Sequence, residues 1–113
     1  MKRIEAIIRP QRLEAVKIAL SEMGVTGVSV TDVRGSGGRS SAQHLFAGSD
    51  YVLDLPMKIK IEAVVMDEDV TEVVNTIEAQ ARSGSPGDGM IFVLPVAETI
   101  RIRTQERGDD ALV

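Results

Sequence analysis

The chain contains no cysteine and no tryptophan among its 113 residues, and its only aromatic residues are Phe46, Tyr51 and Phe92. Without cysteine there can be no disulfide, no thiolate metal site and no thiol nucleophile. With so few aromatics, the core must be aliphatic. No apolar run approaches the ~20 residues of a membrane span, and no apolar signal segment is recognisable at the start. We therefore expect a cytoplasmic protein with no direct membrane insertion.

The composition is that of a globular protein, with 43% hydrophobic and 27% charged residues. A chain of this length suits one domain, residues 1–113, and is too short for two. The net charge of −4 argues against a nucleic-acid partner, because such affinity depends on neutralising phosphates.

Several segments have the patterns of β-strands. Apolar and polar residues alternate over residues 3–9 and again over 57–65. Residues 25–34 are rich in valine and threonine, which favours a third strand. The apolar run 91–96 predicts a buried strand, and residues 100–103 alternate once more.

Two amphipathic helices are predicted between these strands. The first follows Pro10, which suits a first helical turn, and ends before Gly24 as the C-cap. The second has Asp67 as its expected N-cap and runs to Ala81. The order strand, helix, strand, strand, helix, strand is the ferredoxin-like βαββαβ pattern, an α+β fold with an antiparallel sheet and two helices on one face.

The second face of this sheet would be covered by neither helix. Apolar residues nevertheless occur at its positions, including Ile7 and Val64. Association with further copies of the chain is the simple way to bury them.

Residues 36–56 form an unusually long connection between two predicted strands. Most connections are about 4–6 residues, so a loop of this length favours a binding or signalling role. It holds the only histidine, His44, and the only tyrosine, Tyr51. A lone histidine cannot build a catalytic triad or a protein metal site, so we expect no catalytic and no metal-binding residues. Tyr51 is either a modification site or an anchor of the loop.

Glycine-rich turns and two arginines are candidates for phosphate binding. Residues 35–38 (GSGG) allow positive φ and close approach of an anion to backbone N–H groups, although for this motif taken alone a flexible hinge is the favoured explanation. Residues 87–89 (GDG) form either a second such site or a plain turn. Arg101 and Arg103 would point the same way from a final strand, and they suit bidentate phosphate contacts or ordinary surface ion pairs.

Taken in order, these segments resemble the PII nitrogen-signalling family over essentially the whole chain. The resemblance implies a trimer of ferredoxin-like subunits with ATP or ADP bound in the clefts between them. It identifies residues 36–56 as the T-loop that engages target proteins and residues 97–113 as a C-terminal segment. It also implies that Mg²⁺ with ATP helps to bind 2-oxoglutarate at the loop base. The matching stretches are KRIEAIIRP (2–10), VTDVRGSG (30–37), GSDYVLD (48–54), KIKIE (58–62) and GDGMIFVLPVAETIRIRTQERGDDA (87–111).

The same resemblance assigns roles to individual residues. Lys58 matches the lysine that pairs with a 2-oxoglutarate carboxylate, and Tyr51 matches a tyrosine that many bacterial members uridylylate. Candidate nucleotide-binding residues by position are Ser29, Gly35, Gly37, Gly38, Arg39, Glu62, Val64, Gly87, Asp88, Gly89, Met90, Arg101 and Arg103.

Three departures from the family pattern stand out. Arg39 replaces the usual glutamine that contacts Mg²⁺ and 2-oxoglutarate, although Ser40 takes that place if the alignment slips by one residue. Met90 replaces a phosphate-contacting lysine, and Ala47 replaces the arginine that plugs ammonium channels. Arginine has only hydrogen-bond donors and cannot ligate a metal. We therefore expect weakened 2-oxoglutarate binding, with Arg39 holding a phosphate or small anion instead.

The favoured function is a non-enzymatic, PII-type sensor of ATP and ADP that regulates nitrogen-metabolism enzymes or membrane transporters through the T-loop. One alternative is a PII-like regulator of another transporter or pathway that senses a different metabolite, for example bicarbonate or AMP and ADP. Another is a slow ATP-hydrolysing enzyme. RNA binding on the sheet face needs stacking aromatic residues on the strands. Phe92 is the only aromatic residue in a predicted strand, so this function is set aside.

Overall fold

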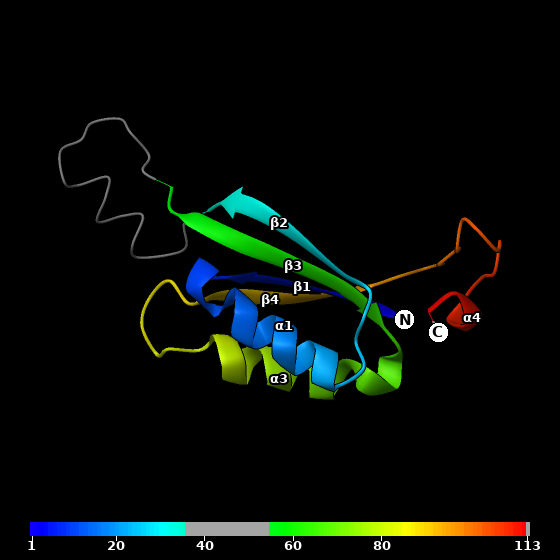
Figure 1. Ribbon diagram of the computed structural model, residues 1–113, viewed down its shortest axis with the longest axis horizontal. Coiled ribbons are helices and arrows are strands. Elements are labelled where there is room, and N and C mark those ends of the chain that lie inside the picture. Colours follow the sequence, from blue (N-terminus) through cyan, green and yellow to red (C-terminus); the bar gives the residue numbers. More distant parts are fainter. Residues whose placement is uncertain (36–54, 113) are drawn as a thin grey trace.

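The computed structural model describes residues 1–35 and 55–112. Strands and helices follow one another in the order that the sequence predicts (Figure 1). The elements are β1 (Lys2–Ile8), the 3-10 turn η1 (Pro10–Arg12), α1 (Leu13–Glu22), β2 (Val28–Arg34), β3 (Met57–Val65), the 3-10 turn η2 (Asp67–Asp69), α3 (Val70–Ala81), β4 (Gly89–Pro95) and α4 (Asp109–Leu112). Most of the predicted T-loop lies outside the described residues.

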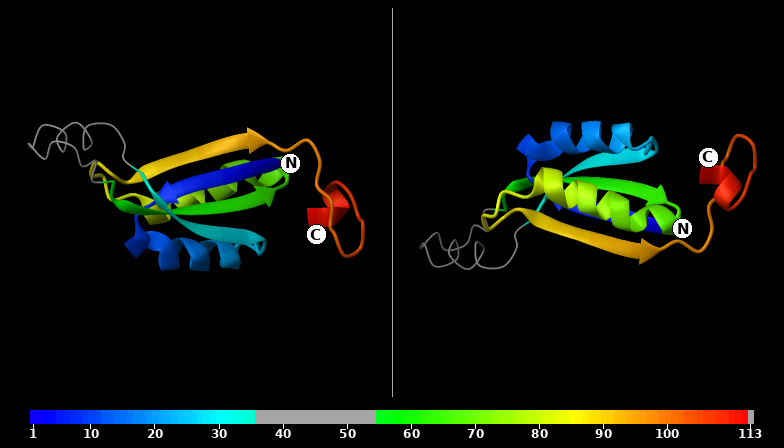
Figure 2. Two further views of the ribbon diagram at one scale, coloured as in Figure 1. Left: turned by 90° about the horizontal axis from the view of Figure 1, so that it is seen from above. Right: turned by 90° about the horizontal axis from the view of Figure 1, so that it is seen from below.

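The four strands form one antiparallel sheet in the order β2-β3-β1-β4. Helices α1 and α3 lie side by side against one face of this sheet, and no helix of the described chain covers the other face (Figure 2). This arrangement confirms the predicted ferredoxin-like α+β fold. No helix within the described residues is long and apolar enough to cross a membrane.

An aliphatic core fills the space between sheet and helices. Alternate residues of β1 and β3 point toward the helices, as period-two patterning requires. Burial of each large aliphatic side chain contributes roughly 1.5–3 kcal/mol to folding. The buried residues are Ile4, Ala6, Ile8, Val16, Leu20, Ile59, Ile61, Ala63, Val65, Val73, Ile77 and Ala81.

The end of α1 follows from one glycine. Gly24 has φ +85°, which favours glycine because it has no Cβ. Its amide donates to the Ser21 carbonyl at 2.9 Å, and the Val25 amide donates to the Leu20 carbonyl at 3.0 Å. This pair of bonds is a Schellman motif. The chain is thereby turned back toward β2, so the predicted helix stop at Gly24 is confirmed.

The predicted start of the second helix was wrong in its chemistry. Met66 is the N-cap of the 3-10 turn η2 and Asp69 is the N-cap of α3, whereas Asp67 is the first residue within η2. The Asp67 carboxylate accepts from the α-ammonium group of Met1 at 2.8 Å. The ion pair lowers the pKa of Asp67, chiefly through the hydrogen bond from that ammonium.

β4 is not the buried strand that its apolar run predicted. Among the described strands it lies at the edge of the sheet, next to β1 alone, and Met90, Phe92 and Val93 are 61%, 46% and 45% exposed in the single chain. Met57, at the start of β3, is also exposed, although the alternation over residues 57–65 puts it on the same face as the buried Ile59 and Ile61. The helices cover the middle of the sheet and leave its edges and ends open.

The prediction of a strand over residues 100–103 was also wrong. Ile100 forms a single isolated bridge with Arg107, and a turn at residues 102–104 separates them. The Gln105 amide donates to the Arg101 carbonyl at 2.7 Å, and the Arg101 amide donates to the Glu106 carbonyl at 2.9 Å. Because these bonds lie within the segment, it folds back on itself instead of pairing with the sheet.

The uncovered sheet face has a charged centre. Lys60 lies 3.3 Å from Glu62 and 3.6 Å from Glu5, and Arg3 lies 3.3 Å from Glu5 and 3.9 Å from Glu62. The two cations and two anions therefore balance within one chain. Any partner that covered this face would meet paired charges rather than a net charge.

Candidate functional site

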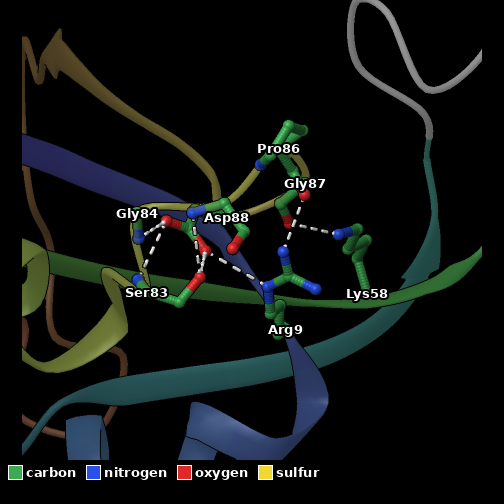
Figure 3. A network of polar contacts seen from close by, with 8 residues as sticks. Arg9, Lys58, Ser83, Gly84, Pro86, Gly87 and Asp88 are labelled. Atoms are coloured by element: carbon green, nitrogen blue, oxygen red, sulfur yellow. Dashed lines mark hydrogen bonds and ion pairs between the residues drawn. The ribbon is translucent and has the colours of Figure 1, made fainter.

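One candidate site lies where the loop between α3 and β4 meets the ends of β1 and β3. Antiparallel pairing of Ile8 with Gly89 brings the end of β1 beside the start of β4. Residues 83–88 form a loop there (Figure 3). The carboxylate of Asp88 organises it, accepting from the Ser83 amide at 2.9 Å, the Gly84 amide at 2.8 Å and the Ser83 hydroxyl.

Asp88 is also paired with Arg9. The Arg9 Nε donates to Asp88 Oδ1 at 3.2 Å. The hydrogen bonds from Ser83, then those from Gly84 and Arg9, hold the pKa of Asp88 well below its usual range. An ionised Asp88 therefore fixes the loop conformation across the neutral pH range.

Two cations lie next to the glycine turn. Arg9 donates through Nη2 to the Pro86 carbonyl at 2.7 Å, and Lys58 donates through Nζ to the Gly87 carbonyl (Figure 3). Burial lowers the pKa of Lys58, the positive charge of Arg9 lowers it further, and Asp88 opposes both. Two neighbouring cations that repel each other favour an added anion.

Gly89 is required by close packing of backbones. It has φ +109°, and a Cβ built on it would lie 1.7 Å from the Ile7 carbonyl oxygen. Gly87 has φ +97°, and a Cβ there would lie 3.3 Å from Arg9 Nη2. Both positions therefore favour glycine for their backbone conformation, and Gly89 also needs it for space. The sequence alone had left residues 87–89 as either a plain turn or a phosphate site, and the close backbone packing is a structural reason for the glycine at position 89.

A second group of candidates lies at the opposite end of the sheet. Val64 and Arg101 line a cavity of about 590 Å³. Gly27 of the α1–β2 connection, Glu72 of α3 and Leu112 of α4 contribute to the same wall. Its volume is within the ~300–1,000 Å³ typical of small-molecule sites.

The two candidate arginines do not lie on a strand. Arg101 donates through Nη2 to the Ala111 carbonyl at 3.0 Å, and its Nη1 lies 3.8 Å from Glu106 Oε1. Arg103 lies in the exposed turn that follows.

Ser29 and Glu62 are cross-strand neighbours on the uncovered face, and Glu62 belongs to the charged centre with Lys60. Gly35 follows β2 and donates its amide to the Pro56 carbonyl at 3.2 Å, which closes the base of the connection. Met90 is exposed at the start of β4. Gly37, Gly38, Arg39, Ser40, His44, Ala47 and Tyr51 lie outside the described residues.

A single chain does not bring all the candidates together. Lys58 and Val64 are six residues apart on β3, which is about 20 Å at the usual strand rise. The loop of residues 83–88 and the C-terminal segment accordingly lie at opposite ends of the molecule (Figure 1). The candidates form two half-sites, one with Lys58 and residues 87–89 and the other with Val64 and Arg101.

Sequence reasoning missed Arg9 and Ser83. Arg9 gave a usable signal, because it continues the uncovered face of an alternating strand and an antiparallel partner would place it beside Asp88. Ser83 gave none, since its role depends on the shape of one loop. Among the described residues, no group of three or more histidine, aspartate or glutamate side chains is arranged to hold a metal ion.

Fold and sites together define a ferredoxin-like α+β domain with a cation-flanked glycine turn at one end and a cavity at the other. The family model for nitrogen regulatory protein P-II matches residues 1–106, and the chain belongs to that family. It is 46% identical to nitrogen regulatory protein P-II of Azospirillum brasilense and of Rhodospirillum rubrum, and 47% identical to that of Klebsiella oxytoca. Each comparison covers 99% of this chain and 100% of the relative. These relatives are named as regulatory proteins, so this is a family of regulators.

Proposed function

We propose that the protein is a cytoplasmic PII-type signal-transduction protein without catalytic function. It binds ATP or ADP in clefts between the subunits of a homotrimer. It transmits the nucleotide state to nitrogen-metabolism enzymes or membrane transporters through residues 36–56.

The separation of the two half-sites is the observation that carries this proposal. A nucleotide cannot contact residues 87–89 and Arg101 of one chain when these lie at opposite ends of the sheet. A second copy that placed its Arg101 end against the Lys58 end of the first would complete the site. Head-to-tail contacts of this kind close into a ring when the rotation permits, and the resemblance to the PII family favours a ring of three.

Each half-site has chemistry for part of the nucleotide. Backbone N–H groups of residues 87–89, with Lys58 and Arg9 beside them, suit phosphate oxygens. In the neighbouring copy, the cavity beside Val64 suits the base, and Arg101 of that copy adds a guanidinium. Bound Mg²⁺ would take most of its ligands from phosphates and water.

The uncovered sheet face supports association. Phe92 is 46% exposed in the single chain and follows Met90 on the same face. Around the internally balanced charges of Lys60 and Glu5, these apolar groups gain from burial against another copy.

A small-anion sensor is the second candidate. Arg9 and Lys58 lie in one chain and would hold bicarbonate or another small anion without Arg101. Met90 supplies no cation for an outer phosphate. A protein with this second function would respond to the anion as strongly as to the nucleotide.

Light scattering and calorimetry test the proposal together. We expect a trimer at micromolar concentration, and a stable 12.2 kDa monomer would contradict the association. Arg101→Ala and Arg103→Ala should each weaken ATP binding by about 1.5–3 kcal/mol, the contribution of a charge-assisted hydrogen bond. Unchanged affinity in both variants would refute the assignment.

Complementation tests whether the site lies between chains. An Arg9→Ala/Lys58→Ala variant and an Arg101→Ala/Arg103→Ala variant should each bind ATP poorly. Mixed trimers made by co-expression should recover some intact clefts. In such a cleft one variant supplies intact Arg9 and Lys58, and the other supplies intact Arg101 and Arg103. If native mass spectrometry shows mixed trimers and calorimetry finds no recovered sites, the cleft does not lie between subunits.

A further inference from the structure

The C-terminal segment contacts the Arg101 guanidinium, the group that a nucleotide phosphate would need. Arg101 donates to the Ala111 carbonyl at 3.0 Å and lies 3.8 Å from the Glu106 carboxylate. Ala111 and Leu112 line the same cavity as Arg101 and Val64. One cation of the second half-site is therefore engaged by the chain's own carbonyl and carboxylate.

This engagement depends on a defined set of backbone bonds. The Gly108 amide donates to the Thr99 carbonyl at 2.9 Å, and the Ala111 amide donates to the Gly108 carbonyl at 3.0 Å. With the isolated bridge between Ile100 and Arg107, these bonds place α4 against Arg101. The C-terminal helix has only four residues and has no buried residue, so it is held mainly by such local bonds.

We propose that residues 106–112 act as a latch that competes with nucleotide phosphate for Arg101. A guanidinium that contacts a phosphate in a bidentate manner uses a fixed pair of donors. The Ala111 carbonyl takes one of the Arg101 nitrogens, and the Glu106 carboxylate places a negative charge where the phosphate charge would arrive. Nucleotide binding therefore releases α4 and exposes the C-terminal residues as a signal separate from the T-loop. This inference rests on the proposed nucleotide function.

The distinguishing variant is Glu106→Gln, which removes the competing charge and keeps the shape. We expect ATP to bind about two- to fivefold more tightly, the scale of an exposed ion pair, and the gain should shrink at high salt. Glu14→Gln is the matched control. It breaks the exposed 3.2 Å ion pair with Lys17 on α1, outside the C-terminal segment, and should leave ATP affinity unchanged.

Hydrogen exchange on the unmodified protein gives a second test. Saturating ATP should speed exchange of the Gly108 and Ala111 amides, because their bonds hold the latch closed. Exchange of the β1 and β3 amides should not increase. Slower or unchanged exchange at both C-terminal amides, or weaker ATP binding in Glu106→Gln, would overturn the latch. Failure of the unmodified protein to bind any adenine nucleotide would instead refute the proposed function, so the two failures are distinguishable.

Discussion

Gly89 links the glycine turn to the sheet, and its replacement by alanine should strongly destabilise the fold. The new Cβ would lie 1.7 Å from the Ile7 carbonyl oxygen and 2.8 Å from its carbon. These are backbone atoms of β1, which cannot move aside as a flexible side chain does. The β1–β4 ladder must therefore open at its first pair, Ile8 with Gly89.

Two costs add up in Gly89→Ala. An L-residue at φ +109° costs about 1–2 kcal/mol, and loss of one or two ladder hydrogen bonds costs about 1 kcal/mol each. The sum, roughly 2–4 kcal/mol, is a large share of the 5–15 kcal/mol that stabilises a typical domain. Gly84→Ala is the control, because Gly84 has φ +89° but nothing within 4 Å of its Cβ position. It should lose only the conformational part, about 1–2 kcal/mol.

Urea unfolding at one fixed protein concentration measures both variants, since association makes apparent stability concentration-dependent. The midpoint for Gly89→Ala should lie clearly below that of Gly84→Ala. Equal free energies of unfolding would show that β1 and β4 do not approach as closely as described, and the steric argument would fail.

Three further predictions concern the cation-flanked turn. Met90→Lys should raise the preference for ATP over ADP, whereas the natural chain should show a ratio below about 100, or some 2.7 kcal/mol; a larger natural ratio would mean that another group holds the outer phosphate. Because the pKa of Asp88 is depressed in the folded protein, its contribution to stability is complete above the ordinary carboxyl pKa near 4 and is lost as pH falls below it. Asp88→Asn should therefore lower the melting temperature at pH 7 and flatten its decline in acid, and an unchanged acid profile would contradict the role of this carboxylate. Finally, 2-oxoglutarate should bind weakly in saturating Mg-ATP; micromolar binding that Lys58→Ala abolishes would show that the change at Arg39 has no such effect.

Local sequence determined most of the secondary structure. Period-two alternation located β1 and β3 because successive strand side chains face opposite sides. Gly24 located the end of α1 because an L-residue resists the positive φ that the Schellman motif needs. The order of these elements sufficed for the fold class, since short, regular connections leave few topologies.

The errors share a physical cause. The apolar run of β4 indicated burial, but burial depends on which strand lies at the edge of the sheet, and hydrogen bonding between distant segments decides that. The alternation of residues 100–103 indicated a strand, yet a strand needs a partner, and Arg101 pairs locally with Glu106 instead. Asp67 is a residue type that favours N-caps, but in the folded chain its carboxylate pairs with the Met1 ammonium.

For the candidate site, the sequence by itself supplied the glycine turn of residues 87–89, Lys58 and Arg101, because glycine conformations and fixed charges are properties of single residues. Only the tertiary structure decided how they are grouped. It placed Arg9 beside Asp88 and put Lys58 and Arg101 at opposite ends of one sheet. That grouping depends on strand register, which pairs residues some eighty positions apart and has no local sequence signal.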